Sequence, residues 1–377
     1  MHQDPKGTSY AGPDIPHRSL SSLHAPIKQE LLEAVSRVLD GDDFAGDGEV
    51  DAFERRFAEM LGTKHAVSFS SGTNALGLTL RAMGLQYGEE VITVPNAPVV
   101  TVSSIALAGG SPAFVDVGDD YNIDPSRVEE ALTPRTRAII ATHLTGRPAA
   151  MDELNALGVK FGLVVVEDAG QAFLARYRGR PVGALGSVGC FSLDQSNPLG
   201  ACGDGGVAVT DDAQFADRLL ALRNSAHLAG ETVYWVPDTS LAAIQAAILL
   251  VKLEQVRAWT ERRRRNATFY QEALNGLEGL TVPKDCEWEH SAYHSFVVRT
   301  KRRDDLKAHL AERGIGSDIP FGKPLHLQPV AFPLGYRVGD FPNAEAQSGE
   351  ALCLPVQASL TEEHLHIVAE GVRNFFV

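Results

Sequence analysis

The chain has 377 residues, of which 44% are hydrophobic and 22% are charged, and its formal net charge is −14. That length and composition are ordinary for a globular protein that buries a sizeable core. The acidic balance and the absence of a long Lys/Arg run argue against nucleic-acid binding, and no apolar run approaches the ~20 residues of a membrane span. The polar N-terminus lacks the apolar core of a signal peptide, so we expect a cytoplasmic protein that contacts neither nucleic acid nor membrane.

The N-terminal part of the chain predicts an irregular arm followed by two helices. Residues 1–24 show no regular apolar spacing and are predicted as the arm. Apolar residues at helical spacing predict amphipathic helices at 27–39 and 50–61, and the stretch DDFAGDGEV between them predicts a loop.

An alternation of strands and helices follows and predicts the fold class. Its strands are short, apolar and rich in β-branched residues. The predicted strands are 65–71, 91–94, 112–117, 137–144, 163–168, 189–193 and 205–210. Because strands this apolar are covered on both faces, we expect an α/β fold with a mainly parallel sheet between helices, in a large domain that spans 25–240.

The last third of the chain changes pattern. Residues 241–275 predict one long helix that bridges two domains, and its four consecutive arginines at 262–265 are predicted to lie on an exposed face. Residues 276–377 predict a small α+β domain that ends in a helix at 362–376. No metal site is expected, because the four cysteines form no CxxC pair and the HLH stretch lies on that final helix, where residues i and i+2 point apart.

Ligands in open α/β sheets bind at the carboxyl ends of strands, and two predicted strands end in polar groups there. The first is followed by Ser71, Gly72 and Thr73, where the N–H groups of a helix start favour an anion, although a simple helix cap explains the same residues. The second ends at Asp168, with Gln171 one short turn later. A carboxylate there is poorly solvated and needs a donor or cationic partner, although it is equally explained as a structural hydrogen bond or a cap.

Two further segments carry candidate residues. The stretch FSLDQSNPLGACGDGG places Ser192 at a strand end, and its glycines allow close approach to the backbone. The stretch IPFGKPLHLQP in the predicted small domain carries Lys323 and His326, each of which is more commonly a surface or packing residue. Neither segment by itself identifies a ligand.

These four segments, in this order, resemble the DegT-like sugar aminotransferase family of fold-type I pyridoxal-phosphate (PLP) enzymes. The resemblance covers roughly residues 25–375, and it implies the fold-type I aminotransferase fold and a homodimer with its site at the subunit interface. It is carried by FERRFAEMLGTKHAVSFSSGTNAL, GEEVITVP, HLTGRPAAMDEL, VVEDAGQAF, GRPVGALGSVGCFS, LGACGDGGVAVT, LRNSA, PLHLQP and CLPV.

The resemblance also implies roles for individual residues. Thr73 and the neighbouring amides of Ser71 and Gly72 match the turn that holds the cofactor phosphate. Asp168 matches the carboxylate that pairs with the pyridinium nitrogen. Gln171 matches the residue beside the ring hydroxyl, and Ser192 matches a serine that contacts the phosphate.

Other positions depart from the family pattern. The lysine that forms the Schiff base falls on Asn197, whose amide cannot form an imine or shuttle a proton. The aromatic residue that stacks on the cofactor ring falls on Val99. In the segment that a neighbouring subunit lends to the site, the phosphate-binding Asn and Arg fall on Asp238 and Ser240. The HYP motif of the family reads PFG at 320–322.

Three hypotheses follow. In the first, the chain is an enzyme of sugar or secondary-metabolite biosynthesis that no longer holds PLP covalently and acts on a small polar molecule. Its acid–base groups are then drawn from the vacated pocket. The acid–base candidates there are Asp168, Asp194, Asp238, Lys323 and His326, and Asn197 is a further candidate catalytic residue because it stands at the position of the family lysine. In the second, PLP or its amino form, pyridoxamine phosphate (PMP), still binds noncovalently for a reaction on a keto sugar, such as a dehydration. In the third, the chain is a non-catalytic partner of an active homologue.

Overall fold

A computed structural model describes residues 14–41, 47–224, 227–228, 231–232 and 238–376. Several stretches singled out in the sequence lie partly outside the described residues. These are the first thirteen residues of the predicted arm, positions 42–46 of the predicted loop, the end of the LRNSA motif, and positions 236–237 before Asp238.

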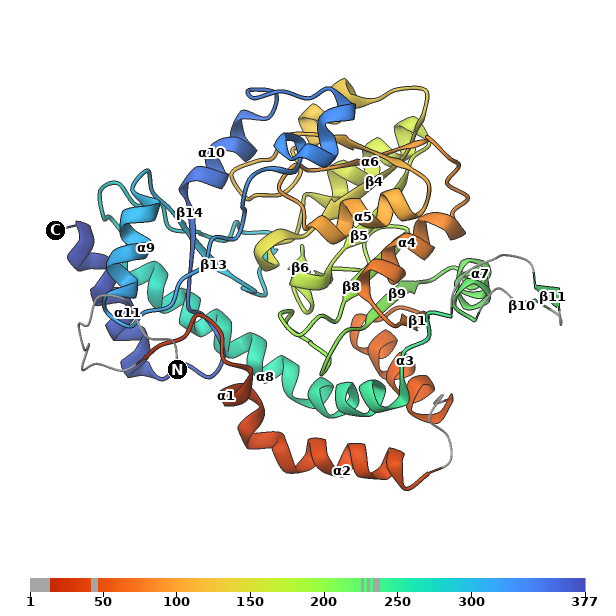
Figure 1. Ribbon diagram of the computed structural model, residues 1–377, viewed down its shortest axis with the longest axis horizontal. Coiled ribbons are helices and arrows are strands. Elements are labelled where there is room, and N and C mark those ends of the chain that lie inside the picture. Colours follow the sequence, from red (N-terminus) through yellow and green to blue (C-terminus); the bar gives the residue numbers. More distant parts are fainter. Residues whose placement is uncertain (1–13, 42–46, 225–226, 229–230, 233–237, 377) are drawn as a thin grey trace.

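A seven-stranded sheet forms the centre of the molecule (Figure 1). Its strands are β1 (His65–Phe69), β2 (Glu90–Thr93), β3 (Ser111–Phe114), β4 (Thr136–Thr142), β5 (Val164–Asp168), β8 (Val188–Ser192) and β9 (Gly206–Thr210). Their spatial order is β1-β9-β8-β5-β4-β2-β3. All neighbours from β8 to β3 are parallel, whereas β9 is antiparallel to both β8 and β1. The predicted mainly parallel α/β sheet is therefore confirmed, with one reversed strand.

Helices cover both faces of this sheet and create two buried apolar clusters. One cluster contains side chains of α4 (Gly72–Ala82), α5 (Val99–Leu107) and α7 (Ala213–Arg223). The other contains side chains of α3 (Asp47–Leu61), α6 (Met151–Phe161) and α8 (Ala243–Ala273). The sheet is the middle of three layers, as expected for strands that are apolar on both faces.

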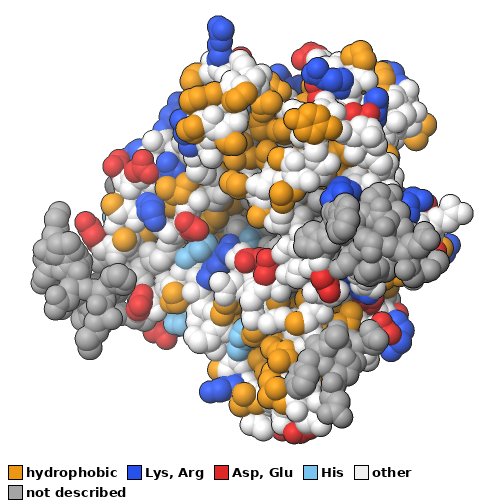
Figure 2. All heavy atoms as spheres, turned by 45° about the vertical axis from the view of Figure 1, so that its right-hand side comes forward, with side chains coloured by type: hydrophobic (Ala, Val, Ile, Leu, Met, Phe, Trp, Pro, Cys, Tyr) orange, Lys and Arg blue, Asp and Glu red, His pale blue; other side chains and the backbone are white. Residues whose placement is uncertain are grey.

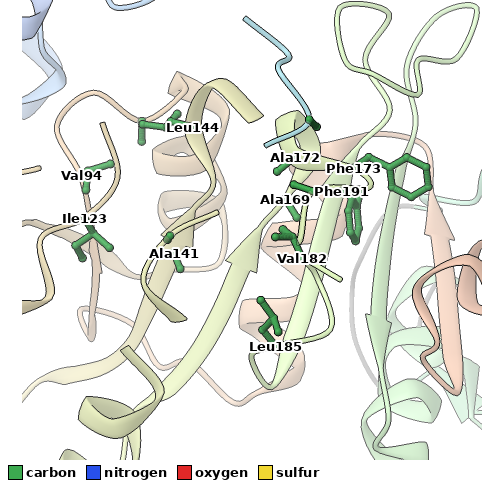
Figure 3. Close-up of a cluster of buried hydrophobic side chains, with 14 of the residues drawn as sticks. Val94, Ile123, Ala141, Leu144, Ala169, Ala172, Phe173, Val182, Leu185 and Phe191 are labelled. Carbon is green, nitrogen blue, oxygen red and sulfur yellow. The ribbon is translucent and has the colours of Figure 1, made fainter. Parts of the chain in front are cut away.

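The second cluster includes an aromatic group beneath the loop that follows β8. Figure 3 shows Phe173 and Phe191 next to each other within this cluster. Their ring centroids lie 5.7 Å apart in an edge-on arrangement, and the Phe57 ring of α3 packs on both. Such aromatic contacts contribute beyond simple area burial. They fix the end of β8, and with it the start of the candidate site.

The N-terminal region differs from its prediction at two places. The last residues of the predicted irregular arm form a short helix, α1 (Leu20–His24), because the Ser19 hydroxyl accepts the Ser22 N–H and caps its first turn. Helix α2 (Lys28–Leu39) follows and lies alongside α8 (Figure 1). Helix α3 begins at Asp47, inside the stretch predicted as a loop.

The C-terminal part builds a third apolar cluster, which is separate from the two clusters on the faces of the large sheet. It is enclosed by the C-terminal half of α8, by α9 (Arg303–Ala311), by α11 (Glu362–Phe376) and by the antiparallel pair β13 (Phe296–Arg299) and β14 (Ala351–Leu354). Figure 1 shows α8 running from the large sheet to this region. The predicted long helix is therefore present. The arm joins this cluster through Ile15, which is fully buried.

The remaining elements are short. Two small sheets are formed by β6 (Arg176–Tyr177), β7 (Arg180–Pro181) and β12 (Glu289–His290), and by β10 (His227–Leu228) and β11 (Glu231–Thr232). Helix α10 (Pro342–Glu350) precedes β14. Single 3-10 turns occupy Ala25–Ile27, Pro125–Arg127, Glu129–Ala131, Leu144–Gly146, Gly170–Ala172, Leu325–Leu327 and Pro329–Leu334.

The prediction that the four arginines of α8 lie on an exposed face is wrong for Arg263. Its side chain is buried, in a stripe with Val256, Thr260, Ala267 and Tyr270. These residues follow one another at intervals of three or four, so they share one helix face. The four consecutive arginines do not show this helical spacing in the sequence, because the other three arginines lie on other faces of α8.

A buried carboxylate ties the strands next to the candidate site together. Glu167 of β5 is 0% exposed. One of its oxygens accepts the backbone N–H groups of Leu185 and Gly186, both at 2.7 Å. The other accepts the Gly183 N–H at 2.7 Å and the Nε2 proton of His143 at 3.0 Å. Four donors therefore hold the loop before β8 and the end of β4 against β5.

We expect Glu167→Gln to lower the free energy of unfolding by about 3 kcal/mol. An amide nitrogen would face backbone N–H groups that need an acceptor, and leaving buried donors unpaired is costly. Urea-induced unfolding monitored by circular dichroism measures the change. The control is Glu59→Gln, which removes a carboxylate that is 65% exposed and should cost under ~0.5 kcal/mol. Equal stability of the two variants would contradict the role assigned to Glu167.

Candidate functional site

The turn between β1 and α4 is built against the end of β8. Ser71 caps α4, and its hydroxyl accepts the Asn74 N–H at 3.1 Å. A Cβ at Gly72 would clash with the Ser192 side chain, so only glycine allows the turn to lie this close to β8. The structure therefore brings the predicted group of Ser71, Gly72 and Thr73 together with Ser192. The cap and the anion-binding amides occupy the same helix start.

Asp168 ends β5 and is held by a residue that the sequence did not single out. Its Oδ2 accepts the Thr101 hydroxyl of α5 at 2.6 Å, and Thr101 is fully buried. Burial raises the pKa of Asp168 above its ordinary value, while the hydrogen bond from Thr101 opposes that rise. In the sequence, Thr101 is a lone polar residue in the apolar stretch VVTV near the start of α5, and nothing in that stretch points to Asp168.

The neighbouring histidine is also part of this arrangement. The His143 N–H donates to the main-chain oxygen of Asp168 at 3.0 Å. The His143 ring accepts the Ala149 N–H at Nδ1, 2.9 Å away, so Nε2 carries the proton that goes to Glu167. His143 therefore positions the ends of β4 and β5 relative to each other.

Gln171 follows the end of β5 by three residues, and its side chain forms a hydrogen bond with a backbone group. Its Oε1 accepts the Thr145 N–H at 2.8 Å, which fixes the side chain toward the end of β4. Thr145 has a φ of 62°, in the left-handed region. The hydrogen bond helps to hold that backbone conformation.

The loop after β8 places Asn197 beside Ser192. The Asn197 amide donates from Nδ2 to the main-chain oxygen of Ser192 at 2.9 Å, and its own N–H donates to the Asp194 carbonyl at 2.9 Å. Asp194 shapes this loop, because its Oδ1 accepts both the N–H and the hydroxyl of Ser196 at 2.8 and 2.6 Å. The Asn197 side chain also comes close to Gly170, two residues after Asp168.

Negatively charged groups flank the turn at Gly72. Burial and the nearby Asp194 raise the pKa of Asp204, and the N–H groups of Gly205 and Gly72 oppose that rise. Asp238 is exposed, and hydrogen bonds from Ser240 lower its pKa. Its neighbour Thr239 accepts the Ser70 N–H at 2.6 Å, which places this segment beside the turn of the same chain.

The remaining predicted residues lie in different surroundings. Val99 opens α5 with 60% of its side chain exposed. Lys323 is exposed. His326 is fully buried, where its Nε2 lies 3.1 Å from Glu345 and its ring packs edge-on against Phe341. The described hydrogen bonds do not link Lys323 or His326 to Asp168 or Asn197, so these two residues are not brought into the group around β5 and β8.

The structure adds a cavity that the sequence did not predict. It has a volume of about 390 Å³ and lies between the arm, the loop that carries Asn197 and the start of β13. Arg18, Arg263 and His294 line it together with Asn197. On the face shown in Figure 2, basic, histidine and acidic side chains lie close together near the middle, whereas apolar side chains are spread mainly over the upper half.

The described residues contain no group of three or more His, Cys, Asp or Glu side chains placed to hold a metal ion. None of the described helices is both long enough and apolar enough to cross a membrane.

Comparison with known proteins identifies relatives over almost the whole chain. A model of the DegT/DnrJ/EryC1/StrS aminotransferase family matches residues 25–373. The chain is 36% identical to a pleiotropic regulatory protein of Geobacillus stearothermophilus, over 96% of this chain and 99% of the relative. It is 37% identical to a dTDP-3-amino-3,4,6-trideoxy-alpha-D-glucose transaminase of Streptomyces venezuelae, over 96% of each chain.

Solved structures agree with this match. The crystal structure of S. venezuelae DesV in complex with a ketimine intermediate superposes with a TM-score of 0.94 at 37% identity, over 97% of this chain and 99% of that one. A DegT DnrJ EryC1 StrS aminotransferase from Brucella abortus gives a TM-score of 0.91 at 32% identity, with the same coverage. The resemblance seen in the sequence is thus confirmed, and the chain belongs to the DegT/DnrJ/EryC1/StrS aminotransferase family.

Proposed function

We propose that this chain is an enzyme of sugar or secondary-metabolite biosynthesis that acts without covalently bound PLP, with Asp168 as its acid–base group. The observation that carries this proposal is the position of Asn197. The loop where the family resemblance places the Schiff-base lysine presents an amide, and that amide is hydrogen-bonded to Ser192. An amide has neither the nucleophilicity nor the basicity that the lysine supplies.

The other residues of the pocket fit a covalently held cofactor poorly. Val99 offers no aromatic face for stacking. The Asp204 carboxylate lies beside the turn, and Asp238 precedes Thr239, whose carbonyl accepts the Ser70 N–H. A carboxylate ~4 Å from a dianionic phosphate would repel it by about 4 kcal/mol per unit charge.

Another lysine near the loop does not supply the missing amine in this arrangement. Lys252 of α8 is buried, and its Nζ donates to the Gly200 carbonyl at 2.7 Å and lies 3.8 Å from the Cys202 sulfur. Burial lowers the pKa of Lys252. The Lys252 ammonium thus contacts the end of the loop that is distant from Ser192. This supports the proposal that Lys252 does not act as the Schiff-base lysine.

The chemistry that remains is proton transfer by a carboxyl group with a raised pKa. Such a group exchanges protons closer to neutral pH than an ordinary aspartate, which suits a general acid or base. The Thr101 hydroxyl fixes its orientation, and amides of the turn at Gly72 can hold a hydroxyl group of the substrate. Relatives that are named as transaminases of dTDP-linked and UDP-linked sugars support a sugar-like substrate.

We also propose a homodimer in which the partner covers this site. Two exposed valines, Val99 and Val100, begin α5 next to the buried Thr101, and Leu107 at its end is 69% exposed. Exposed apolar side chains grouped at a site support an interface there.

A second candidate function is noncovalent use of PMP, for example in a dehydration of a keto sugar. The observation in its favour is the half-buried carboxyl of Asp168, which has a hydroxyl partner but forms no described ion pair with Lys or Arg. A ring N–H would be a suitable additional donor. The third candidate, a non-catalytic partner subunit, predicts isolation in a complex with a homologue that carries the lysine.

We expect no covalent adduct when the purified protein is incubated with PLP and reduced with borohydride. Mass spectrometry of the denatured protein measures covalent attachment, and a parallel analysis of small molecules released by denaturation detects bound PMP. A relative that carries the lysine serves as the positive control. Stoichiometric labelling of one lysine would overturn the proposal, whereas copurified PMP would favour the second candidate function.

We expect Asn197→Lys by itself not to create a functional PLP site. The variant would contain a lysine at this position. However, Val99 would still provide no aromatic surface for the cofactor ring, and Asp238 would still not bind the cofactor phosphate. The measurement is the visible absorption of the variant with PLP and then with an amino donor such as L-glutamate. Conversion of the bound PLP to its amino form at a rate comparable with that of a lysine-bearing relative would contradict this expectation.

We expect the wild type to gain stability relative to Asp168→Asn as the pH falls from 7.5 to 5. Because the folded-state pKa of Asp168 is raised, the folded protein binds a proton more tightly than the unfolded chain does, and stability is lost as pH rises through that pKa. The relative change is at most about 1.4 kcal/mol per pH unit. Urea unfolding at several pH values measures it. Asp119→Asn, at a side chain that is 95% exposed, should follow the wild type, and a flat difference for Asp168→Asn would contradict the raised pKa.

A further inference from the structure

We propose that the cavity between the N-terminal arm and the loop after β8 binds a small organic anion, a carboxylate or a phosphate ester, through Arg18 and Arg263. This site lies beside the proposed reaction site and does not depend on whether a cofactor is used. The cavity has a volume of about 390 Å³, within the range of small-molecule sites. Its lining is His17, Arg18, Ser19, Leu20, Leu23, Gln195, Ser196, Asn197, Pro198, Arg263, His294, Val356, Gln357 and Ala358.

The charge of the lining has one sign. The lining includes two guanidinium groups and two imidazoles, and no Asp or Glu is among its residues. Guanidinium groups bind carboxylates and phosphates through paired, charge-assisted hydrogen bonds. A cavity of this composition therefore selects for an anion.

Arg263 is the strongest evidence for a missing anionic partner. Its side chain is only 7% exposed, and its donors reach the Ala292 carbonyl from Nε at 3.2 Å and the Thr260 hydroxyl from Nη2 at 2.9 Å. Among the described residues it forms no ion pair, and burial lowers its pKa to about 10. Buried charges are normally paired, so a charge in this position is stabilised by a ligand of opposite sign.

Arg18 and the histidines complete the lining. The Arg18 guanidinium lies 3.1 Å from Nε2 of His294 and 3.3 Å from the Ser196 carbonyl, so it joins the arm to the Asn197 loop. Burial, together with Arg18 and Arg263, lowers the pKa of His294, so its ring accepts from Arg18 and keeps its proton on Nδ1. Burial also lowers the pKa of His17 to about 4. The positive charge at neutral pH therefore comes from the two arginines.

The arm forms a fixed wall of this cavity. Ile15 exchanges two backbone hydrogen bonds of 2.8 Å with Gly314 and Gly316, and its side chain is fully buried. A Cβ at Gly316 would clash with the backbone of the arm, so a glycine is required there. Gln357 binds the arm as well, through the Ser19 N–H and the Pro16 carbonyl. The arm residues that line the cavity are therefore held in place by the fold.

The lining also indicates an organic anion in preference to an inorganic one. Leu20, Leu23, Pro198, Val356 and Ala358 provide apolar surface opposite the charged groups. A ligand with a short carbon skeleton can contact this surface while its anionic group binds the arginines. The same ligand would touch Asn197, whose amide also lies beside Ser192. The cavity thus adjoins the proposed reaction site through one residue.

Isothermal titration calorimetry tests the proposal with three probes: glutarate, glycerol 3-phosphate and inorganic phosphate. At low ionic strength we expect saturable binding of at least one organic probe. Arg18→Ala and Arg263→Met should each raise its Kd at least tenfold. Arg265→Ala, on the same helix but at an exposed side chain outside the cavity lining, should leave the Kd within twofold of the wild type.

The outcomes separate the alternatives. Failure of both organic probes to bind, or equal affinity of the wild type and the two variants, would overturn the site. Binding of inorganic phosphate as tightly as the organic probes would overturn the organic class of ligand. If Arg263→Met does not fold, Arg18→Ala still decides, because Arg18 is exposed.

Discussion

The carboxylate of Glu167 is the interaction on which the centre of the structure depends. It accepts four hydrogen bonds in a fully buried position, and these bonds join β5, the end of β4 and the loop before β8. Successive side chains of a strand point to opposite faces, so the next residue, Asp168, faces the other way. The Glu167 carboxylate therefore stabilises the fold. Asp168, at the end of the strand, has a raised pKa and accepts a hydrogen bond from one hydroxyl group, that of Thr101.

The candidate site combines a tightly packed turn at Gly72 with an amide side chain at Asn197. The chain belongs to the DegT/DnrJ/EryC1/StrS aminotransferase family, and the turn at Gly72 still packs against Ser192. Beside it, Asn197 donates to the Ser192 backbone, and Thr101 donates to Asp168. Both contacts are made within the chain itself. Asn197 supplies no amine and Asp168 has a raised pKa, and on these grounds we propose proton transfer by Asp168 in place of covalent attachment of a cofactor.

Asn197 also connects the proposed reaction site with the positively charged cavity. Asn197 lies in the loop after β8. Its side chain comes close to Gly170, and the residue also lines the cavity. An anion held by Arg18 and Arg263 would thus lie against the residue on which the family resemblance places the lysine. The arm, which is anchored to Gly314 and Gly316, closes the cavity from the side of the small C-terminal sheet.

The sequence by itself determined the fold class, the positions of most strands and the group of Ser71, Gly72, Asp168 and Ser192, because apolar periodicity and family motifs are local patterns. It could not reveal Thr101 as the partner of Asp168, since the two are 67 residues apart and meet only when α5 packs on the sheet. The same limit explains Arg263, which reads as one of four surface arginines until α8 is docked. Burial depends on how helices and strands pack against one another. Only the tertiary structure therefore determined which charged side chains are buried.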